Sequence, residues 1–452
     1  MTSADVAVLG AGPAGLMAAR RLAANGRSVV LVERAPVVGG MAGSFEIAGV
    51  RVDFGSHRLH PVAAPALLDD LRAVLGPDLQ TRVRNGRIAL ADRWLRFPLR
   101  LGDLVRNLPR PFLARVAFDT VTGPLRRRDG ANAREVIEAR LGRTVAENFY
   151  TPYIQKLWGM DAAELSPELA DRRVSARSGL AVVKKALRTR RGTEGAGTFL
   201  YPVRGFGQIS EALAAAAADA GADIRLDTAV AGLDLRDDGE FEVGTVLSTI
   251  PVGLLARLAD APAEVVAAAA DLRYRAMVLV YLVLDRDRLT AFDAHYFPEL
   301  RTPVSRLSEP KNFRDGPDPQ DVTVVCAELP CWEGDATWAA DEDDLAAQVM
   351  ATLEPLGFAW PALVGVEVRR IARCYPVYSG GYEASLDTLE GWAQAQPRLL
   401  TLGRQGLYAP DNTHHVLEMG SQAAAVVRPD GSVDRAAWTA MREAFRSHVV
   451  ED

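Results

Sequence analysis

Three glycines near the start of the chain have the spacing needed to hold a pyrophosphate. Gly10 allows a tight turn, Gly12 lets phosphate oxygens approach the backbone, and Gly15 lets a helix pack closely on a strand. The N-terminus of that helix would present unpaired N–H groups and the positive end of its dipole to the phosphates. Glu33 follows later, and its carboxylate can accept hydrogen bonds from both ribose hydroxyls while repelling a 2′-phosphate. The set predicts a dinucleotide site.

A second group of chemically capable residues follows in the segment that contains His57, Arg58 and His60. Two histidines at this spacing could begin a metal site, but the sequence places no convincing third ligand beside them, so we expect no metal. One interpretation is that both rings form hydrogen bonds to backbone groups at a turn. The other is that one histidine contacts a cofactor or positions substrate, while Arg58 binds a substrate anion.

The elements around the glycines are those that a dinucleotide site requires. An apolar run over residues 6–9 predicts a strand that ends at Gly10, a helical pattern follows to Asn25, and a second apolar run over 29–32 ends at Glu33. A lone glycine motif would be weak evidence. Here the strand, turn, helix, second strand and acid agree.

Later segments extend the same architecture. A helix over 209–220 and strands over 222–226, 243–250 and 398–402 are predicted from their periodicity and apolar runs. We therefore predict an α/β fold (α+β overall), with a Rossmann-type nucleotide domain, an inserted mixed substrate domain and a helical segment. The nucleotide domain would comprise 1–60, 199–250 and 398–452, and the substrate domain 61–198 and 251–397.

The inserted segments differ from one another in pattern. The first reads as mostly helical, over 67–75, 101–108, 133–141 and 144–157. The second contains the continuous apolar run 277–284, which is typical of a strand buried on both faces. Basic runs at 126–128 and 188–191 are expected in exposed loops.

Residues after Glu33 indicate which dinucleotide cofactor the site binds. Arg34 is followed after four residues by Gly39-Gly40 and then by Met41-Ala-Gly-Ser44. This pattern resembles flavoproteins of the amine oxidase, phytoene desaturase and protoporphyrinogen oxidase superfamily, and the resemblance implies FAD. The residues expected to bind FAD are Gly10, Gly12, Pro13, Ala14, Gly15, Glu33, Arg34, Gly39, Gly40, Met41, Ser44, Gly55, Ser56, Val230, Gly403, Arg404, Met419 and Gly420.

A narrower resemblance covers nearly the whole chain. The segment Gly55-Ser-His57-Arg58-Leu-His60 resembles the Gly-x-His-x-x-His element of UDP-galactopyranose mutases and, more closely, the Gly-x-His-Arg form in bacterial protoporphyrinogen-oxidase-like relatives. In the implied fold these residues approach the isoalloxazine, which makes His57, Arg58 and His60 catalytic candidates. The arginines and tyrosines expected to bind substrate are Arg172, Arg173, Arg275, Arg306, Tyr375 and Tyr378.

The C-terminal cofactor element begins at Gly403-Arg404. In relatives a Gly-Arg pair here closes over the flavin and pyrophosphate, and the following helix, expected after Met419, directs its N-terminus at the flavin. Relatives usually carry Asn-Asn-x-Asp-His where this chain has Asp411-Asn-Thr-His-His415. That departure leaves the individual roles of these residues open.

The amino-acid composition disfavours several other classes of protein. A net charge of −6 disfavours nucleic-acid binding. Three cysteines without CxxC spacing favour a reducing compartment, so we expect a cytoplasmic protein with no disulfide framework and no zinc site. The chain contains no uninterrupted apolar run of about 18 residues, so we expect no transmembrane segment. The expected partner is a small molecule, anionic if the arginines bind it, and a homodimer is left open.

Three functions follow. The leading hypothesis is an FAD-dependent oxidoreductase that transfers a hydride from a small-molecule substrate to flavin N5. The alternative is a redox-neutral, flavin-dependent sugar-nucleotide isomerase that resembles UDP-galactopyranose mutase. A non-catalytic protein that keeps FAD as a structural group is disfavoured, because a complete cofactor signature accompanies candidate pocket residues.

Overall fold

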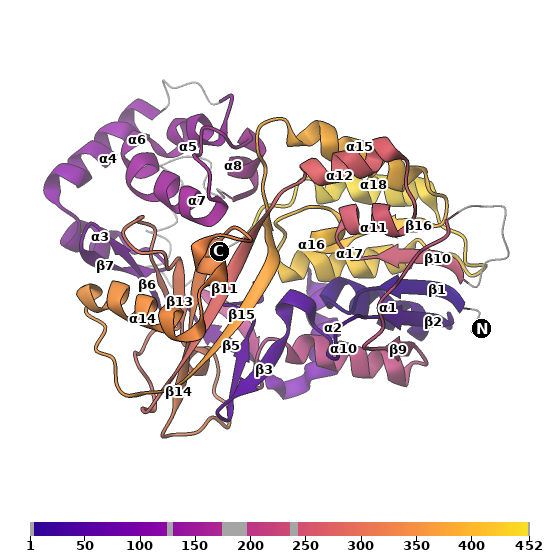
Figure 1. Cartoon of the computed structure of the whole chain (residues 1–452), viewed down its shortest axis with the longest axis horizontal. Coiled ribbons are helices and arrows are strands. Elements are labelled where there is room, and N and C mark those ends of the chain that lie inside the picture. Colours follow the sequence, from indigo (N-terminus) through magenta and orange to yellow (C-terminus); the bar gives the residue numbers. More distant parts are fainter. Residues whose placement is uncertain (1–3, 124–129, 174–196, 236–242, 451–452) are drawn as a thin grey trace.

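The computed structural model describes residues 4–123, 130–173, 197–235 and 243–450 (Figure 1). A five-stranded parallel sheet has the order β16-β10-β1-β2-β9. Its strands come from three separated stretches of the sequence: β1 (Ala4–Leu9), β2 (Val29–Val32), β9 (Asp223–Arg225), β10 (Val243–Ser248) and β16 (Leu399–Thr401). The predicted nucleotide-type sheet is therefore present. The basic runs expected at 126–128 and 188–191 lie outside the described residues.

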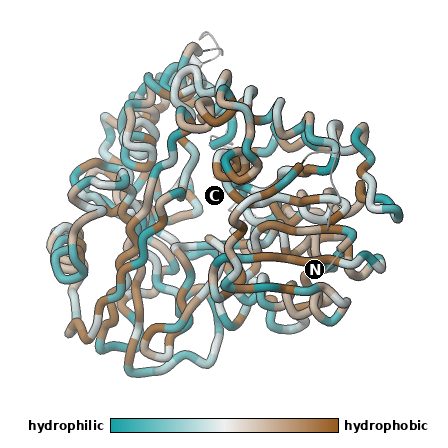
Figure 2. The backbone as a smooth tube through the Cα atoms, turned by 45° about the vertical axis from the view of Figure 1, so that its right-hand side comes forward, coloured by the Kyte–Doolittle hydropathy of each residue, from teal (hydrophilic) through white to brown (hydrophobic). Residues whose placement is uncertain are grey.

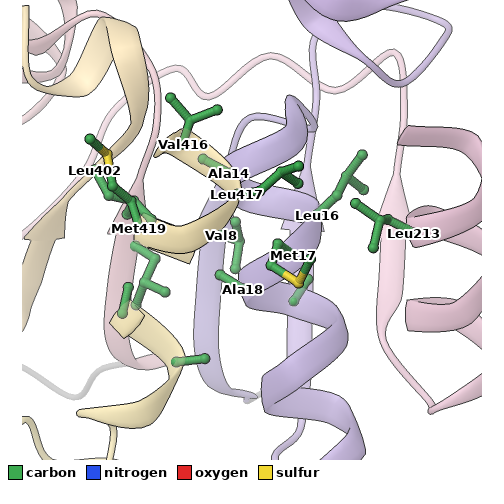
Figure 3. Packing of buried hydrophobic residues seen from close by; sticks show 14 of the residues in the cluster. Val8, Ala14, Leu16, Met17, Ala18, Leu213, Leu402, Val416, Leu417 and Met419 are labelled. Atoms are coloured by element: carbon green, nitrogen blue, oxygen red, sulfur yellow. The ribbon is translucent and has the colours of Figure 1, made fainter. Parts of the chain in front are cut away.

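Three helices form the main apolar core on the parallel sheet: α1 (Pro13–Ala24), α10 (Gln208–Asp219) and α17 (Thr413–Ala425). Figure 3 shows Ala14 of α1 beside Leu417 of α17, and Met419 of α17 on the side of Leu402. A Cβ atom at Gly420 would lie 2.3 Å from the Ala14 carbonyl oxygen. Only glycine therefore permits the observed approach of α17 to α1.

A second, seven-stranded mixed sheet has the order β15-β11-β14-β13-β12-β6-β7. Its strands are β6 (Gly86–Leu90), β7 (Arg93–Phe97), β11 (Tyr274–Leu284), β12 (Ala294–Tyr296), β13 (Arg306–Ser308), β14 (Thr323–Cys331) and β15 (Leu363–Pro376). The prediction for 277–284 is confirmed, because every residue of β11 after Tyr274 is buried. Alternate β11 side chains enter two different apolar clusters, one on each face of the sheet.

The predicted helical segment caps one end of the mixed sheet (Figure 1). It contains α3 (Leu101–Asn107), α4 (Arg110–Thr122), α5 (Ala133–Leu141), α6 (Arg143–Val145), a π turn (Ala146–Tyr150), α7 (Thr151–Trp158) and α8 (Pro167–Arg173). The single helix predicted over 144–157 is wrong, because it is divided by the π turn. Pro152 lies at the start of α7 and has no N–H to continue a regular ladder.

The helices expected in the substrate domain differ in the core that they join. Helix α2 (Pro65–Leu75) joins the core of α1 and α10. Helices α11 (Val252–Leu258), α12 (Ala263–Asp271) and α15 (Tyr382–Ala395) lie with α18 (Arg435–Phe445) above this sheet (Figure 1). Leu255 and Ala393 pack on the parallel sheet, but all three of the helices α11, α12 and α15 also share an apolar cluster with the helical segment. The α2 helix after residue 61 therefore belongs to the core of the parallel sheet, while the helices after residue 251 contact both cores, and the domain boundaries stay predictions.

The remaining elements connect these layers. They are the hairpin β3 (Ser44–Ile47) and β4 (Val50–Asp53), the pair β5 (Leu79–Val83) and β8 (Thr198–Pro202), helices α13 (Ala336–Ala339), α14 (Glu342–Leu353) and α16 (Gly403–Gly406), and short 3-10 turns at Gly40–Ala42, Gly76–Asp78, Pro310–Asn312 and Glu354–Leu356. Figure 2 shows the hydrophobic segments concentrated along the strands of both sheets. Within the described ranges, none of the helices has the length and apolar character to cross a bilayer.

Candidate active site

A cavity of about 570 Å³ runs from the glycine turn of the parallel sheet to the mixed sheet. Gly10, Gly12 and Glu33 line its first end. Arg306 of β13 and Tyr375 of β15 line the other. The carboxyl ends of β1 and β2 open onto it, which is the usual ligand position in an open parallel sheet.

The first end has the shape expected for a pyrophosphate cradle. Gly12 precedes α1 without any side-chain cap, and a Cβ atom added to it would meet nothing within 4 Å. A Cβ atom at Gly15 would lie 2.1 Å from the Gly10 carbonyl oxygen, so Gly15 serves the packing of helix on strand. The N–H groups at the start of α1 are thus left for an anion, and the residues present fit the phosphates of FAD.

Glu33 is held at the end of β2 by two backbone groups. Its Oε2 accepts a hydrogen bond from Ala11 N at 2.9 Å, and its Oε1 accepts one from Ala35 N at 2.9 Å. These bonds orient the carboxylate toward the glycine turn. Arg34 and Val230 line the adjacent wall, where the adenosine half was expected.

The helix that faces the cavity at the C-terminal element begins earlier than predicted. Helix α17 starts at Thr413, and the Asn412 side chain caps it reciprocally with His415. Asn412 and Thr413 line the cavity together with Gly403 and Arg404. The predicted start after Met419 is wrong, because the polar run before it forms the first helical turn. An Asn at N-cap was the missed signal.

Met419 and Gly420 consequently lie away from the cavity lining. Met419 is fully buried, and Gly420 packs against Ala14. Their part in the site is to seat α17 on α1. The N-terminus of α17 instead directs its dipole into the cavity.

Of the second glycine cluster, Gly40 and Met41 line the cavity. Gly39 has φ +112°, and a Cβ atom there would lie 2.7 Å from Gly43 Cα, so this glycine shapes the turn. Ser44 lies behind it, where its hydroxyl donates to Asp53 at 2.6 Å and accepts from Gly207 N at 2.7 Å.

Asp53 lies next to this turn and connects it to neighbouring segments through hydrogen bonds. Its carboxylate accepts hydrogen bonds from the Tyr201 hydroxyl at 2.5 Å and from Phe206 N at 2.9 Å. Burial raises the pKa of Asp53, and these bonds oppose that rise. Gly55 and Ser56, which follow, line the cavity, and Ser56 N donates to Glu328 at 2.8 Å.

All three catalytic candidates line the cavity. The His57 ring lies 3.2 Å from the Gly55 carbonyl oxygen through Nδ1 and stacks on Phe206 at 5.2 Å. Burial, together with the nearby Arg306 charge, lowers the pKa of His57 to about 4. A neutral ring with Nδ1–H donating to Gly55 keeps its Nε2 lone pair. His60 accepts a hydrogen bond from Val62 N at 3.2 Å.

Arg58 is already paired within the protein. Its guanidinium donates to Asp293 at 3.1 Å and to the Tyr296 hydroxyl at 3.1 Å, and it lies 4.7 Å from the Phe313 ring centroid. Asp293 neutralises its charge in a site that exposes only 10% of the Arg58 side chain. The geometry therefore favours a positioning role over the expected capture of a substrate anion.

The substrate candidates divide into two groups. Arg173, Arg306 and Tyr375 line the cavity. Arg306 forms a bidentate pair with Glu328, at 2.9 Å for each bond. Arg173 lies over the Trp158 and Tyr375 rings, at 5.0 and 5.6 Å.

Arg172, Arg275 and Tyr378 do not line the cavity, so the expectation that they contact substrate is not supported. Arg172 pairs with Glu168 at 2.8 Å. Arg275 donates to the Pro330 carbonyl oxygen at 3.1 Å. The Tyr378 hydroxyl donates to the Tyr408 carbonyl oxygen at 3.0 Å. Each side chain is directed into the protein, although Arg172 Nη1 and the Nε and Nη1 atoms of Arg275 have no hydrogen-bond partner among the described residues.

Several charged and aromatic residues that were not predicted as site residues also line the cavity. They are Arg84, Tyr153, Tyr296 and Arg373. Arg373 precedes Tyr375 on β15, but the pairing of β15 with β11 shifts register between Ile371 and Tyr375, so the strand alternation is interrupted here. The sequence therefore contains no periodic signal that predicts Arg373 as a cavity residue. Together with Arg173 and Arg404, it makes this end of the cavity rich in positive charge.

Comparisons with known proteins agree with this geometry. Over 84–88 aligned residues the chain is 43% identical to the phytoene dehydrogenase of Streptomyces griseus and 42% identical to the putrescine oxidase of Kocuria rosea. These matches cover 20% and 18% of this chain but only 17% of either relative. Most of the length of both relatives is thus unmatched.

Solved structures resemble the fold over its whole length. A reduced UDP-galactopyranose mutase matches with a TM-score of 0.80 at 21% identity, covering 99% of each chain. Cyclohexylamine oxidase from Brevibacterium oxydans matches with a TM-score of 0.66 at 16% identity, over 97% of this chain and 100% of that one. The family model of flavin-containing amine oxidoreductases matches residues 13–427. The chain therefore belongs to the flavin-containing amine oxidoreductase family of FAD-dependent enzymes.

Proposed function

We propose that this protein oxidises a small anionic substrate by hydride transfer to FAD. The observation that carries the proposal is the single cavity that joins the α1 N-terminus to an arginine-rich end. Bound FAD would supply the two-electron acceptor, at flavin N5. Gly12, Glu33 and Arg404 are the residues that would hold it.

The residues at the far end provide recognition and orientation. Arg173 and Arg373 present guanidinium groups that match a carboxylate or phosphate. Arg306 contributes less net charge, because Glu328 accepts two hydrogen bonds from it. Tyr375 lies beneath Arg173 and gives the substrate an aromatic surface.

His57 and α17 complete the electrostatics. The neutral His57 ring can accept a hydrogen bond from a substrate donor at Nε2 and places no positive charge beside the substrate. The N-terminus of α17 favours negative charge at the adjacent part of the cavity. With FAD bound, the N-terminus of α17 would stabilise negative charge on the cofactor, and neutral His57 would orient a substrate donor without adding charge.

Redox-neutral isomerisation of a sugar nucleotide is the second candidate. The same arginines suit a substrate pyrophosphate, and this is the observation that favours it. The two candidates differ in whether the substrate itself loses electrons. A cytoplasmic location and a homodimer also stay predictions.

The first test is a spectrum of the purified flavoprotein under anaerobic conditions. Carboxylate and phosphate-bearing alcohols or amines, simple primary amines and UDP-galactose are each added to the oxidised protein, and then to dithionite-reduced protein. Bleaching of the flavin band by an anionic substrate supports oxidation. Bleaching by neutral or cationic amines alone contradicts the anionic assignment, and sugar turnover only after reduction supports isomerisation.

The arginines can be tested directly. Arg173→Gln and Arg373→Gln should each raise KM for an anionic substrate about tenfold, which corresponds to about 1.4 kcal/mol, with a smaller change in kcat. Arg72→Gln is the matched control, because its side chain is 58% exposed and lies outside the cavity lining. Equal KM values in all three variants would remove the basis for anion recognition.

A further inference from the structure

Three side chains capable of binding a metal converge beside the cavity. Asp411 precedes α17, His415 lies in its first turn, and His448 lies in the C-terminal segment after α18. One ligand atom from each can be chosen so that all lie within 4.8 Å of one another. Neither His57 nor His60 belongs to this group.

The separations suit a small metal ion. His448 Nδ1 lies 3.4 Å from one Asp411 carboxylate oxygen, and His415 Nδ1 lies 3.8 Å from the other. Ligands bound tetrahedrally at about 2.1 Å lie about 3.4 Å apart. The rings of His415 and His448 are stacked at 4.2 Å with an interplanar angle of 11°, and each has its Nδ1 beside a different oxygen of the Asp411 carboxylate. Coordination requires the two rings to tilt out of this stack so that a nitrogen of each faces the same ion.

Asp411 supplies a second, independent observation. Its side chain is 1% exposed, and its buried Oδ1 has no hydrogen-bond partner among the described residues. A buried carboxylate oxygen without a donor is costly unless a cation compensates it. His415 does not supply a proton through Nδ1, because this nitrogen accepts from Asn412 N at 3.3 Å. That hydrogen bond is long and therefore weak, so the lone pair of His415 Nδ1 can turn from Asn412 N to a metal ion with little loss of free energy.

We propose that Asp411, His415 and His448 form a binding site for a divalent transition metal of the zinc class. Two imidazole nitrogens and one carboxylate suit Zn²⁺, whereas Ca²⁺ and Mg²⁺ require sites built from oxygen ligands. The charge of Arg172 acts on His415 and opposes a cation, but Glu168 pairs with this arginine at 2.8 Å.

The metal would fasten the C-terminal segment beside the cavity. Val450 N donates to the Arg172 carbonyl oxygen at 2.7 Å, and Val450 itself lines the cavity. Asp411 also lines the cavity, whereas His415 and His448 do not. Coordination thus links the segment that contains His448 to the start of α17 and gives the site a structural role next to the cofactor.

The test uses the full chain loaded with FAD and freed of metal by a chelator. Zn²⁺ is titrated by calorimetry, and Co²⁺ is used as a spectroscopic probe of four-coordinate geometry. We expect one saturable site per chain. His448→Gln and Asp411→Asn should each weaken Zn²⁺ binding at least tenfold. Hydrogen exchange should show that Zn²⁺ protects the amides of residues 446–450 in the unmodified chain and not in His448→Gln.

His414→Gln is the matched control, because it removes the neighbouring histidine and leaves the three ligands in place. It should bind Zn²⁺ as tightly as the unmodified chain. His448 lies near the chain end with 19% of its side chain exposed, so His448→Gln should fold, which flavin retention verifies. The proposal is overturned if no stoichiometric site exists, or if His448→Gln and Asp411→Asn bind Zn²⁺ as tightly as the control.

Discussion

Replacing Gly12 by Ala should separate cofactor binding from folding. Gly12 has φ −76° and ψ 173°, a conformation that Ala adopts without strain, and the added methyl group meets no protein atom within 4 Å. The space beside Gly12 is nevertheless where a pyrophosphate must approach the α1 N-terminus. The methyl group should therefore obstruct FAD and leave the apoprotein intact.

The size of both effects can be worked out. An Ala in place of Gly at an N-cap costs several tenths of a kcal/mol, about 0.5. Restricting the unfolded chain offsets this by about 0.4–1 kcal/mol, so the apoprotein should change by less than about 0.5 kcal/mol. Overpacking against the phosphates costs about 1–3 kcal/mol, which is about 5- to 150-fold in the FAD dissociation constant.

Urea unfolding of the apoprotein and FAD titration measured by flavin fluorescence give the two quantities. Gly15→Ala is the matched control, because its Cβ atom would lie 2.1 Å from the Gly10 carbonyl oxygen. That variant should lose stability as well as FAD. The reasoning is refuted if Gly12→Ala binds FAD within twofold of the unmodified protein, or if it destabilises the apoprotein as strongly as Gly15→Ala.

Three other predictions follow from buried charge. Glu33→Ala should weaken FAD retention about tenfold, measured as flavin occupancy after dialysis, and unchanged occupancy would exclude its role at the ribose. Glu328→Ala should lower the free energy of unfolding by about 3–5 kcal/mol, because it leaves Arg306 uncompensated, while Asp69→Ala in an exposed pair should have almost no effect in the same urea titration. Burial lowers the pKa of His295 to about 3 from 6.5, so the unfolded chain binds its proton first and stability is lost as pH falls below 6.5. His295→Phe should therefore reduce the loss of unfolding free energy between pH 7 and pH 5 by about 2 kcal/mol, and an unaltered pH profile would contradict this assignment.

Local patterns predicted the nucleotide-binding unit well. The turn at Gly10 and the strand ending at Glu33 lie within one short segment, so spacing and apolar runs were enough to predict their arrangement. The run 277–284 lies in β11, because a strand with apolar side chains on both faces must be covered on both faces, as it is inside a sheet between two layers.

The incorrect predictions concern features that depend on which elements pack against each other. The polar run before Met419 read as a loop, yet Asn412 caps a helix there because α17 packs on α1. Arg172 and Arg173 are adjacent in sequence, but only Arg173 lines the cavity. Neighbouring side chains on a helix point about 100° apart, so the motif could not say which arginine faces the ligand.

The sequence by itself determined the family, the cofactor and the local elements that would hold the phosphates, because these depend on glycines and acids at short, fixed spacing. Only the tertiary structure decided which distant side chains meet. It brought Glu328 to Arg306, Asp293 to Arg58, and His448 to Asp411. Charge neutralisation, burial and pKa depend on these long-range contacts, and no sequence period encodes them.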